Sequence, residues 1–438
     1  MLSRIAASAV LAVFSFSVHA SDLSEAVQQD YDDYLWPLFD HFHRNPELST
    51  IENETAARMA QELRSAGFEV TENVGGTGVV AIMKNGDGPL VMMRADMDGL
   101  PVEEKSGLEN ASRKTQESPI TGNIVPTMHA CGHDVHITSM VGTARHMSER
   151  KDAWSGTLML VVQPAEERVI GAAAMKDDGI WDRFGTPDYA LAFHVSSNDV
   201  AGQINVSEGS PYAGADTVDI IIHGVGAHGA HPHRGKDPIV LGAQIVLALQ
   251  TLVARELSPR VPGVVTVGSF HAGTKHNIIS DRAHLQLTVR NTSAETREIL
   301  LNGIKRIAEN MGRVAGLPDD MLPEVIISTE SVPPTINDAA LARRLKGAWN
   351  TQIGDARVVD IPTRGMGAED FPFLTTDPQI RSVYWAIGGT LQEDFDREAD
   401  GGAPVPSHHS PLFKIAPEPS VTAGVESTVV ALMELMGT

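Results

Sequence analysis

The sequence predicts an α/β protein in which a layered sheet is interrupted by a smaller inserted α+β unit. From residue 21 to about 212, helical and strand periodicities alternate, as they do in α/β layers. Between about 213 and 328 the order changes to βαββαβ, the ferredoxin-like arrangement. Signals of the first type resume over residues 329–438. A length of 438 residues suits two or three domains, so we expect one divided unit and one insertion.

The larger unit contains helices and strands with distinct signals. Glu54–Gly67 is amphipathic and ends on glycine, as a helix C-terminus prefers, and a second helix is expected from about Asp134 to Arg150. Four short apolar runs predict strands, namely Gly78–Met83, Pro89–Arg94, Gly156–Val162 and Asp188–Phe193. The last two are apolar at nearly every position, which predicts strands covered on both faces.

The inserted unit has its own order of elements. Strands are predicted over Asp216–His223, Gly263–His271, Arg282–Arg290 and Glu324–Ser328. The third of these alternates cleanly, with Leu285, Leu287 and Val289 on one face. Helices are predicted over Asp237–Leu257 and after a capping box formed by Thr292 and Glu295.

Composition narrows the class of function. The chain has 34 basic and 56 acidic residues, a net charge of −22, so a phosphate backbone or an anionic membrane would be repelled. We therefore expect neither a nucleic-acid nor a membrane partner. Hydrophobic residues make up 42% of the chain, enough for packed cores. A single cysteine excludes any disulfide within the chain.

The first twenty residues predict a secretory signal peptide. A short positive start precedes an apolar run of 12 residues, Ile5–Phe16, and Val18-His19-Ala20 forms a small-x-small cleavage site. A membrane anchor needs about 20 apolar residues, which this run does not reach. No later stretch is expected to span a membrane. We therefore expect an exported protein, periplasmic or secreted.

Possible metal ligands occur in four segments that the predicted sheet could bring together. Cys131 and His133 directly precede a helix, Glu166-Glu167 follow a buried strand, and His194 ends another strand. His408-His409-Ser-Pro lies near the C-terminus. Open α/β sheets bind small molecules and ions beyond the carboxyl ends of their strands. Thiolate, imidazole and carboxylate groups suit zinc or a similar ion. Taken singly, each residue also fits a buried small residue, a core histidine or a solvated loop.

Several ordered motifs resemble the M20 metallopeptidase/amidohydrolase family. They are Arg94-Ala-Asp-Met-Asp-Gly-Leu-Pro101, Met128-His-Ala-Cys-Gly-His-Asp134, Gln163-Pro-Ala-Glu-Glu167, His194 and His409-Ser-Pro411. The most similar branch contains hippurate, indole-acetyl-amino-acid and other N-acyl-amino-acid hydrolases. The resemblance implies a zinc-hydrolase-like α/β catalytic domain with an inserted ferredoxin-like α+β lid that often dimerises.

The resemblance also implies roles for individual residues. The implied ligands of two divalent metal ions are Cys131, His133, Glu167, His194 and His409. Zinc suits the thiolate of Cys131, while manganese, cobalt and nickel stay open. Glu166 is implied as the general base. Asp96 and Asp98 are implied to orient a ligand histidine rather than to bind metal.

Three residues of the lid match substrate-contacting positions of the family. His228 is implied to polarise the scissile carbonyl, often across a homodimer. Asn277 and Arg290 are implied to hold the substrate carboxylate, a role that suits the fork of an arginine. His231 and His233 are expected at the surface, and Glu369 in a structural role near the metal site.

The resulting hypothesis is a metal-dependent amidohydrolase acting on N-acyl amino acids or small peptide-like amides with a free carboxylate. The alternatives are a metallocarboxypeptidase or dipeptidase of the same family and a non-catalytic exported solute-binding protein. Two departures from the family pattern bear on the substrate: Arg168-Val-Ile170 replaces glycines, and the loop Asn110–Ile124 is long.

Overall fold

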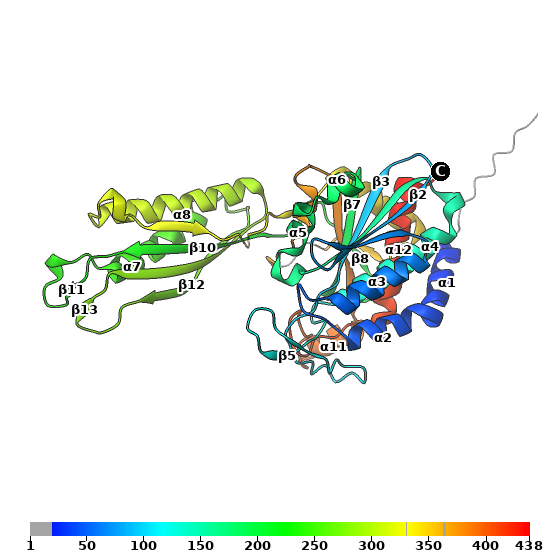
Figure 1. Cartoon of the computed structure of the whole chain (residues 1–438), viewed down its shortest axis with the longest axis horizontal. Coiled ribbons are helices and arrows are strands. Elements are labelled where there is room, and N and C mark those ends of the chain that lie inside the picture. Colours follow the sequence, from blue (N-terminus) through cyan, green and yellow to red (C-terminus); the bar gives the residue numbers. More distant parts are fainter. Residues whose placement is uncertain (1–19, 330, 362–364) are drawn as a thin grey trace, which may run out of the picture.

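The computed structural model describes residues 20–329, 331–361 and 365–438. They form a large α/β unit from which a narrower unit projects on one side (Figure 1). Residues 1–19, which carry nearly all of the predicted signal peptide, lie outside the described part of the chain.

The large unit is built on an eight-stranded sheet with the order β1-β2-β6-β3-β7-β18-β8-β17. The strands are β1 (Glu69–Val74), β2 (Gly78–Asn85), β3 (Leu90–Asp96), β6 (Gly156–Gln163), β7 (Tyr189–Val200), β8 (Ile204–Asn205), β17 (Val358–Val359) and β18 (Arg381–Thr390). The central strands β6, β3, β7 and β18 are parallel, while β1 and β2 are antiparallel additions at one edge.

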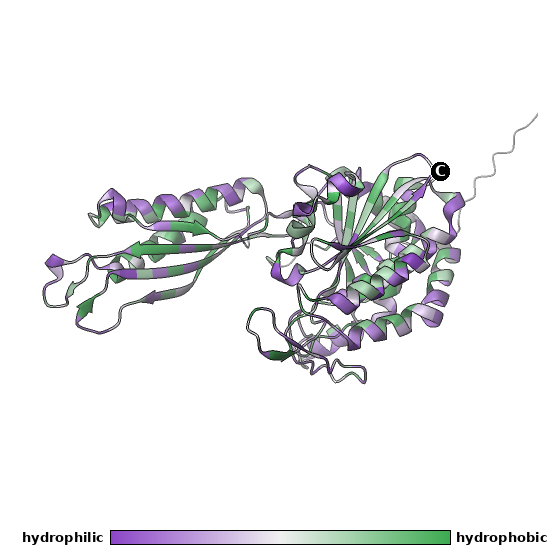
Figure 2. Ribbon diagram, in the orientation of Figure 1, coloured by the Kyte–Doolittle hydropathy of each residue, from purple (hydrophilic) through white to green (hydrophobic). Residues whose placement is uncertain are grey.

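Helices cover both faces of this sheet. One face carries α1 (Ala20–Asp30), α2 (Trp36–Arg44), α3 (Asn53–Ser65), α4 (His133–Glu149), α9 (Ala339–Gln352) and α12 (Pro417–Met436). The other carries α5 (Gly171–Asp177), α6 (Ile180–Phe184) and α10 (Pro372–Thr375). Along β6, Leu158 and Leu160 face the first layer while Met159 and Val161 face the second, which confirms the predicted two-sided burial. Figure 2 shows the resulting apolar strands inside a polar exterior.

The inserted unit has the predicted βαββαβ order. Its elements are β10 (Gly214–His223), α7 (Pro238–Thr251), β12 (Gly263–Ala272), β14 (Arg282–Asn291), α8 (Ala294–Val314) and β15 (Glu324–Ile327). The strands form an antiparallel sheet with the order β12-β14-β10-β15, and both helices pack on it. Residues Leu285, Leu287 and Val289 of β14 are buried, as their alternation predicted.

Two details of the inserted unit differ from what the sequence predicts. Ser293, not Thr292, caps α8, because its hydroxyl accepts a hydrogen bond from Thr296 N at 3.1 Å. Among the described residues, the helical stretch Pro238–Glu256 is long and apolar enough to cross a membrane, so the expectation that no later stretch reaches that length was wrong. Leu241, Ile245 and Leu249 bury one face of it on the sheet.

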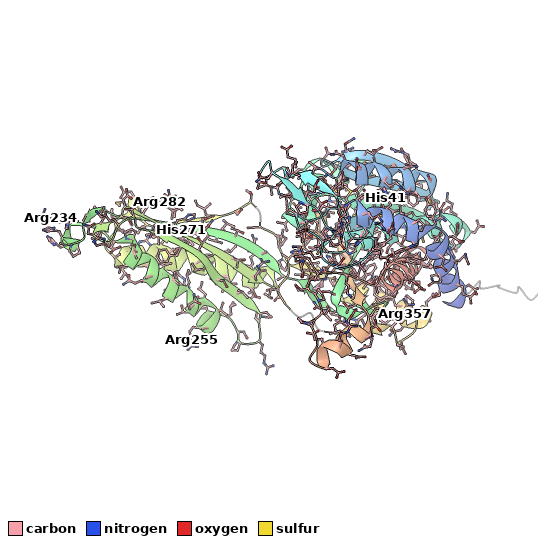
Figure 3. All side chains as sticks on the ribbon, turned by 90° about the horizontal axis from the view of Figure 1, so that it is seen from below. His41, Arg234, Arg255, His271, Arg282 and Arg357 are labelled. Carbon is pink, nitrogen blue, oxygen red and sulfur yellow. The ribbon has the colours of Figure 1, made fainter. Side chains whose placement is uncertain are left out.

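The far end of the inserted unit consists of two short paired strands, β11 (Ala227–His228) and β13 (Ile278–Ile279). In Figure 1 they lie at the end opposite the large unit, and we call this region the lid tip (residues 226–236 and 271–282). Figure 3 shows Arg234 at this end and His271 and Arg282 farther back along the inserted unit, whereas His41 and Arg357 belong to the large unit.

Candidate metal centre

A pocket of about 590 Å³ lies at the carboxyl ends of the central strands. Its lining includes Cys131, Glu166, Glu167, His194, His408 and His409 of the large unit and Arg290 of the inserted unit. Segments that are far apart in the sequence meet here: Cys131 precedes α4 and Glu166 follows β6. His194 lies within β7, not at its end as the sequence predicted, because β7 continues to Val200.

Cys131 is placed by a tight approach of its segment to β7. Gly132 has a φ of 81°, and a Cβ built there would lie 2.3 Å from Val195 Cγ1, so the position requires glycine. The Cys131 Sγ atom lies 3.4 Å from His194 Nε2 and 3.6 Å from His408 Nδ1. Burial raises the pKa of the thiol well above its ordinary value, and Glu167 and Glu166 raise it further. A nearby cation would reverse that effect and favour the thiolate.

His133 is the first residue of α4 and is fully buried. Its Nδ1 lies 3.3 Å from Asp98 Oδ1, while its Nε2 lies 3.9 Å from both Glu166 Oε2 and Glu167 Oε1. Burial opposes protonation, but Asp96 and Asp98 raise the pKa of His133 to about 10. Asp98 therefore lies against the Nδ1 side of the ring, while Nε2 faces the two glutamates.

Glu166 and Glu167 lie in a short 3₁₀ turn, Glu166–Arg168, that directly follows β6. The turn is flanked by two non-glycine residues in the left-handed region, Ala165 with φ 49° and Val169 with φ 51°. Asp98 accepts hydrogen bonds from Glu166 N at 3.2 Å and from Glu167 N at 3.0 Å. Burial raises the pKa of Glu166 well above its ordinary value, and the nearby carboxylates, first Glu369, add to this.

His194 lies in β7, and one nitrogen of its ring contacts the backbone of the same strand. Its Nδ1 lies 2.6 Å from Val195 O, which leaves Nε2 facing Cys131. His136, one turn after His133 on α4, accepts a hydrogen bond from Val195 N through Nε2 at 2.8 Å, and its Nδ1 contacts Asp96. Burial lowers the pKa of His136 to about 3 despite Asp96. His136 thus connects Asp96 to the strand that carries His194.

The two C-terminal histidines face different partners. His409, with a φ of 65°, places Nε2 3.3 Å from Glu167 Oε2. His408 accepts a hydrogen bond from Ser197 N at 3.1 Å and directs Nδ1 toward Cys131. His409 therefore lies beside an implied ligand, while the backbone of β7 holds His408.

A buried cluster of charges lies next to Glu166. Arg94 donates to Asp96 at 2.7 Å and to Glu369 at 2.8 Å, and Asp370 lies 3.3 Å away. Tyr384 donates its hydroxyl to Glu369 at 2.6 Å. Three carboxylates thus share one guanidinium in a dry interior, and this excess of negative charge favours a cation close by.

The donor set fits metal ions. Two groups of donor atoms, each spanning no more than 4.8 Å, are formed by Cys131 with His133 and His194 and by Cys131 with Glu167 and His409. In the described part of the chain, His133 Nε2 and Glu167 Oε1 are buried without a hydrogen-bond partner. Such atoms are costly unless something binds them, and a divalent cation would satisfy both.

The comparisons with known proteins agree with this geometry. The model of peptidase family M20/M25/M40 matches residues 92–399. The chain belongs to this family. A hippurate hydrolase of Campylobacter jejuni is 34% identical over 341 residues, which cover 76% of this chain and 82% of that protein. A thermostable carboxypeptidase of Saccharolobus solfataricus is 33% identical over 400 residues, covering 89% and 93%. This M20-family chain is therefore a hydrolase of the amidohydrolase and peptidase group.

A solved structure extends the similarity to the whole architecture. A Bacillus subtilis protein described as a dinuclear metal-binding peptidase of the M20 family matches with a TM-score of 0.74 at 27% identity. The match covers 94% of this chain and 99% of that chain. The M20 fold therefore includes both the large sheet and the inserted unit.

The structure separates the three lid residues that the resemblance implicates. Arg290 lines the pocket, and burial lowers its pKa from the ordinary value, while Asp216, itself paired with Arg297 at 2.6 Å, opposes that effect. His228 and Asn277 lie together at the lid tip, where Gly229 N donates to Asn277 O. At about 3.3 Å per residue, β14 puts Arg290 roughly 26 Å from Arg282 at the tip end. One chain thus brings Arg290, but not His228 or Asn277, to its own pocket.

Several residues of the site were missed by sequence reasoning. His136 shares a helix face with His133 at a spacing of three, a signal that could have been used. Tyr212 lines the pocket, and its ring centroid lies 6.1 Å from that of His194. Glu52 contacts the turn of Glu166, although nothing in the local sequence relates the two segments. Arg168, expected near the substrate, is not among the described residues lining the pocket, whereas Val169 is.

Proposed function

We propose that this protein is a metal-dependent amidohydrolase that cleaves the amide bond of N-acyl amino acids or small peptide-like amides with a free carboxylate. The observation that carries the proposal is the position of Glu166 beside a buried set of sulfur, nitrogen and oxygen donors, in a pocket that also contains Arg290. Base, ligands and an anion-binding group are the three parts that hydrolysis of such an amide requires.

We assign two divalent ions to Cys131, His133, Glu167, His194 and His409. The assignment is supported by the two donor groups, both of which contain Cys131, and by the B. subtilis relative described as dinuclear. When bound, such ions polarise a carbonyl group and lower the pKa of water. A thiolate and imidazoles suit zinc best.

Glu166 acts as the general base in this proposal. Its backbone N–H is held by Asp98, and its carboxylate faces the donor atoms without being needed to complete either group that contains Cys131. It accepts a proton from the attacking water and delivers it to the leaving amine.

Arg290 binds the carboxylate of the substrate. It is the only arginine or lysine among the described residues that line the pocket, and the neighbouring Asp216 already pairs with Arg297. A guanidinium can bind a carboxylate through two parallel hydrogen bonds. Val169, Ile361 and Met366 provide apolar surface in the same pocket for the rest of the substrate.

The protein acts as a homodimer that assembles through the inserted units. Helix α7 exposes Val240 and Leu247, which are 54% and 73% accessible, and β12 is an edge strand of its sheet. An apolar helix face and an open strand edge on one unit can both be covered by a second copy. This arrangement lets His228 and Asn277 of the partner subunit complete a pocket that one chain leaves without them.

Charge supports such a contact. Residues 213–328 contain 11 basic and 11 acidic residues, so the remainder, with 23 basic and 45 acidic residues, carries the whole net charge of −22. The lid tip contains Arg234, Lys236, Lys275 and Arg282 but one acidic residue, Asp281. A cationic tip complements the acidic large unit of a second copy. We also propose that the predicted signal peptide exports the protein to the periplasm or medium.

Turnover assays test the proposed function. The metal-loaded protein is assayed on N-acetyl and N-benzoyl amino acids, on their C-terminal amides and on dipeptides, with and without a chelator. We expect N-acyl amino acids with a free carboxylate to be hydrolysed fastest and the activity to vanish with the metal. Faster hydrolysis of dipeptides would instead identify a peptidase, and no turnover with any of them a binding protein.

The role of Arg290 is tested with the same substrates. Arg290→Ala should lower kcat/KM for the free acids by a factor that corresponds to about 2–5 kcal/mol of lost transition-state stabilisation. The loss should be much smaller for the amides, because only the acids lose a buried charge pair. Arg260→Ala is the control for loss of a positive charge from the inserted unit, since Arg260 is exposed and does not line the pocket. Equal losses for acids and amides would exclude the carboxylate clamp.

A further inference from the structure

Two buried carboxylates accept hydrogen bonds from the backbone of the turn that carries Glu166 and Glu167. Asp98 accepts from the N–H groups of Glu166 and Glu167. The preceding N–H, that of Ala165, donates to Glu52 Oε1 at 2.8 Å. Three successive backbone donors of one turn are therefore bound by two side chains, one of which had no role in the mechanism above.

Glu52 is buried, and both of its carboxylate oxygens accept hydrogen bonds. Its Oε1 also accepts from Thr50 N at 2.9 Å, and its Oε2 accepts from the Thr77 hydroxyl at 2.5 Å. Its exposed fraction is 0%, and it does not line the pocket. Burial raises the pKa of Glu52 to about 7, and Asp98 adds to this effect. Evidently the carboxylate does not face solvent or substrate; all its described partners are protein groups.

The contact with Ala165 lies where the backbone needs support. Ala165 has φ 49° and ψ 40°. This left-handed conformation is energetically unfavourable for a residue with a side chain, and it persists only where the surrounding structure imposes it. Ala165 directly precedes Glu166, so a change in its conformation would rotate the following turn. A displacement of about 1 Å in a catalytic group can lower a rate by about 10²-fold.

We propose that Glu52 is a positioning residue for the general base: its carboxylate holds the N–H of Ala165 and so keeps the Glu166 side chain in register with the metal ligands. The inference rests on the proposed function of Glu166. The inference predicts that loss of the hydrogen bond from Ala165 N to Glu52 lowers kcat, an effect that the burial of Glu52 alone does not require.

Two substitutions separate the hydrogen bond from the bulk of the side chain. Glu52→Gln keeps Oε1 as acceptor for Ala165 and Thr50, while its new amide N–H₂ can donate to the Thr77 hydroxyl. Glu52→Met has a similar size and shape but no acceptor for either N–H group. Glu52→Gln should therefore retain kcat close to the wild-type value, and Glu52→Met should lower it by about 10²-fold with KM little changed.

Glu47→Met is the matched control. Glu47 is buried to a similar degree, lies five residues away and accepts a hydrogen bond from Thr55 N at 2.7 Å, but its side chain forms no hydrogen bond or ion pair with the described residues 165–167. We expect both methionine variants to lose stability and only Glu52→Met to lose kcat, measured on folded, metal-saturated enzyme. Wild-type kcat in Glu52→Met, or an equal loss in Glu47→Met, would overturn the proposal.

Amide hydrogen exchange provides a readout that does not depend on activity. In metal-loaded protein, exchange in a peptide that covers residues 163–168 should be faster in Glu52→Met than in wild type, and unchanged in Glu52→Gln and Glu47→Met. If the wild-type protein hydrolyses none of the tested amides, the proposed function fails while this comparison still tests the hold on the turn. Unchanged exchange in Glu52→Met would overturn it.

Discussion

Glu166 and Glu167 are adjacent in the sequence, yet their carboxylates have different surroundings. Glu167 lies 3.3 Å from His409 and within the donor group of Cys131, whereas Glu166 lies beside Glu369 and Asp370. We expect Glu166→Gln to retain metal and to lose about 10²–10⁴-fold in turnover, because proton transfer is lost and the ligands remain. Glu167→Gln should lose metal instead. Turnover above about a tenth of wild type in Glu166→Gln would contradict the assignment of the base.

Motifs in the sequence predicted the side chains that can bind metal but not the residues that hold those side chains in place. Cys131, His133, Glu167 and His194 stand out because their types and spacing fit a metal. Glu52 does not, since a buried carboxylate becomes meaningful only through its contacts. His136 was missed although its spacing of three from His133 places both on one helix face. Asn277 was grouped with Arg290, yet the two lie at opposite ends of the inserted unit.

The turn after β6 stores backbone strain at Val169, a β-branched residue with φ 51°. Left-handed backbone costs an L-residue roughly 1–2 kcal/mol and costs glycine almost nothing. Val169→Gly should therefore be more stable than Val169→Ala, by about 1 kcal/mol in denaturant unfolding of the metal-loaded protein. At Ile170, where φ is −124°, alanine should be the more stable of the two. The usual order of alanine over glycine at both positions would mean that Val169 carries no strain.

Helix α2 is joined to α4 through His43. Its Nδ1 lies 2.7 Å from Asp134 and its Nε2 3.3 Å from Glu104; burial opposes protonation, but these carboxylates raise the pKa of His43 to about 10. A raised histidine pKa contributes stability that is complete below the unfolded value of about 6.5 and disappears as pH rises through about 10.

His43→Gln tests this contribution. It should lower the free energy of unfolding by about 3–5 kcal/mol at pH 6, because two carboxylates lose a buried partner, and by less near pH 10. His41→Gln, at an exposed position of the same helix, should change it by less than about 0.5 kcal/mol. Urea unfolding at several pH values measures both; a pH-independent difference would contradict the charged state of His43.

For the whole molecule, the proposed dimer makes each site depend on two chains. His228→Ala and Glu166→Gln should each abolish activity as homodimers. Unfolding and refolding them as a mixture should restore activity, because a mixed dimer contains one site with its own Glu166 and an intact His228 of the partner subunit. With random pairing, about a quarter of wild-type activity is expected. Mixtures that stay inactive, with mixed dimers shown to form, would place His228 outside the site.

A charged residue on α7 tests the interface itself. Leu247→Asp should yield monomers in sedimentation and lose activity, because Leu247 is among the most exposed apolar residues of that helix. Asn302→Asp, at an exposed position of α8, is the control for an added charge. An active monomer would contradict the need for a partner subunit.

The amino-acid sequence alone predicted the two-unit architecture, the βαββαβ order of the insertion and the residues with metal-binding chemistry. These follow from periodicity and residue type, which are local properties of the chain. The folded structure was needed to show which side chains hold the turn of Glu166, where Arg290 lies relative to His228, and which residue caps α8. Those relations depend on contacts between segments up to hundreds of residues apart, and on backbone angles that packing imposes against local preference.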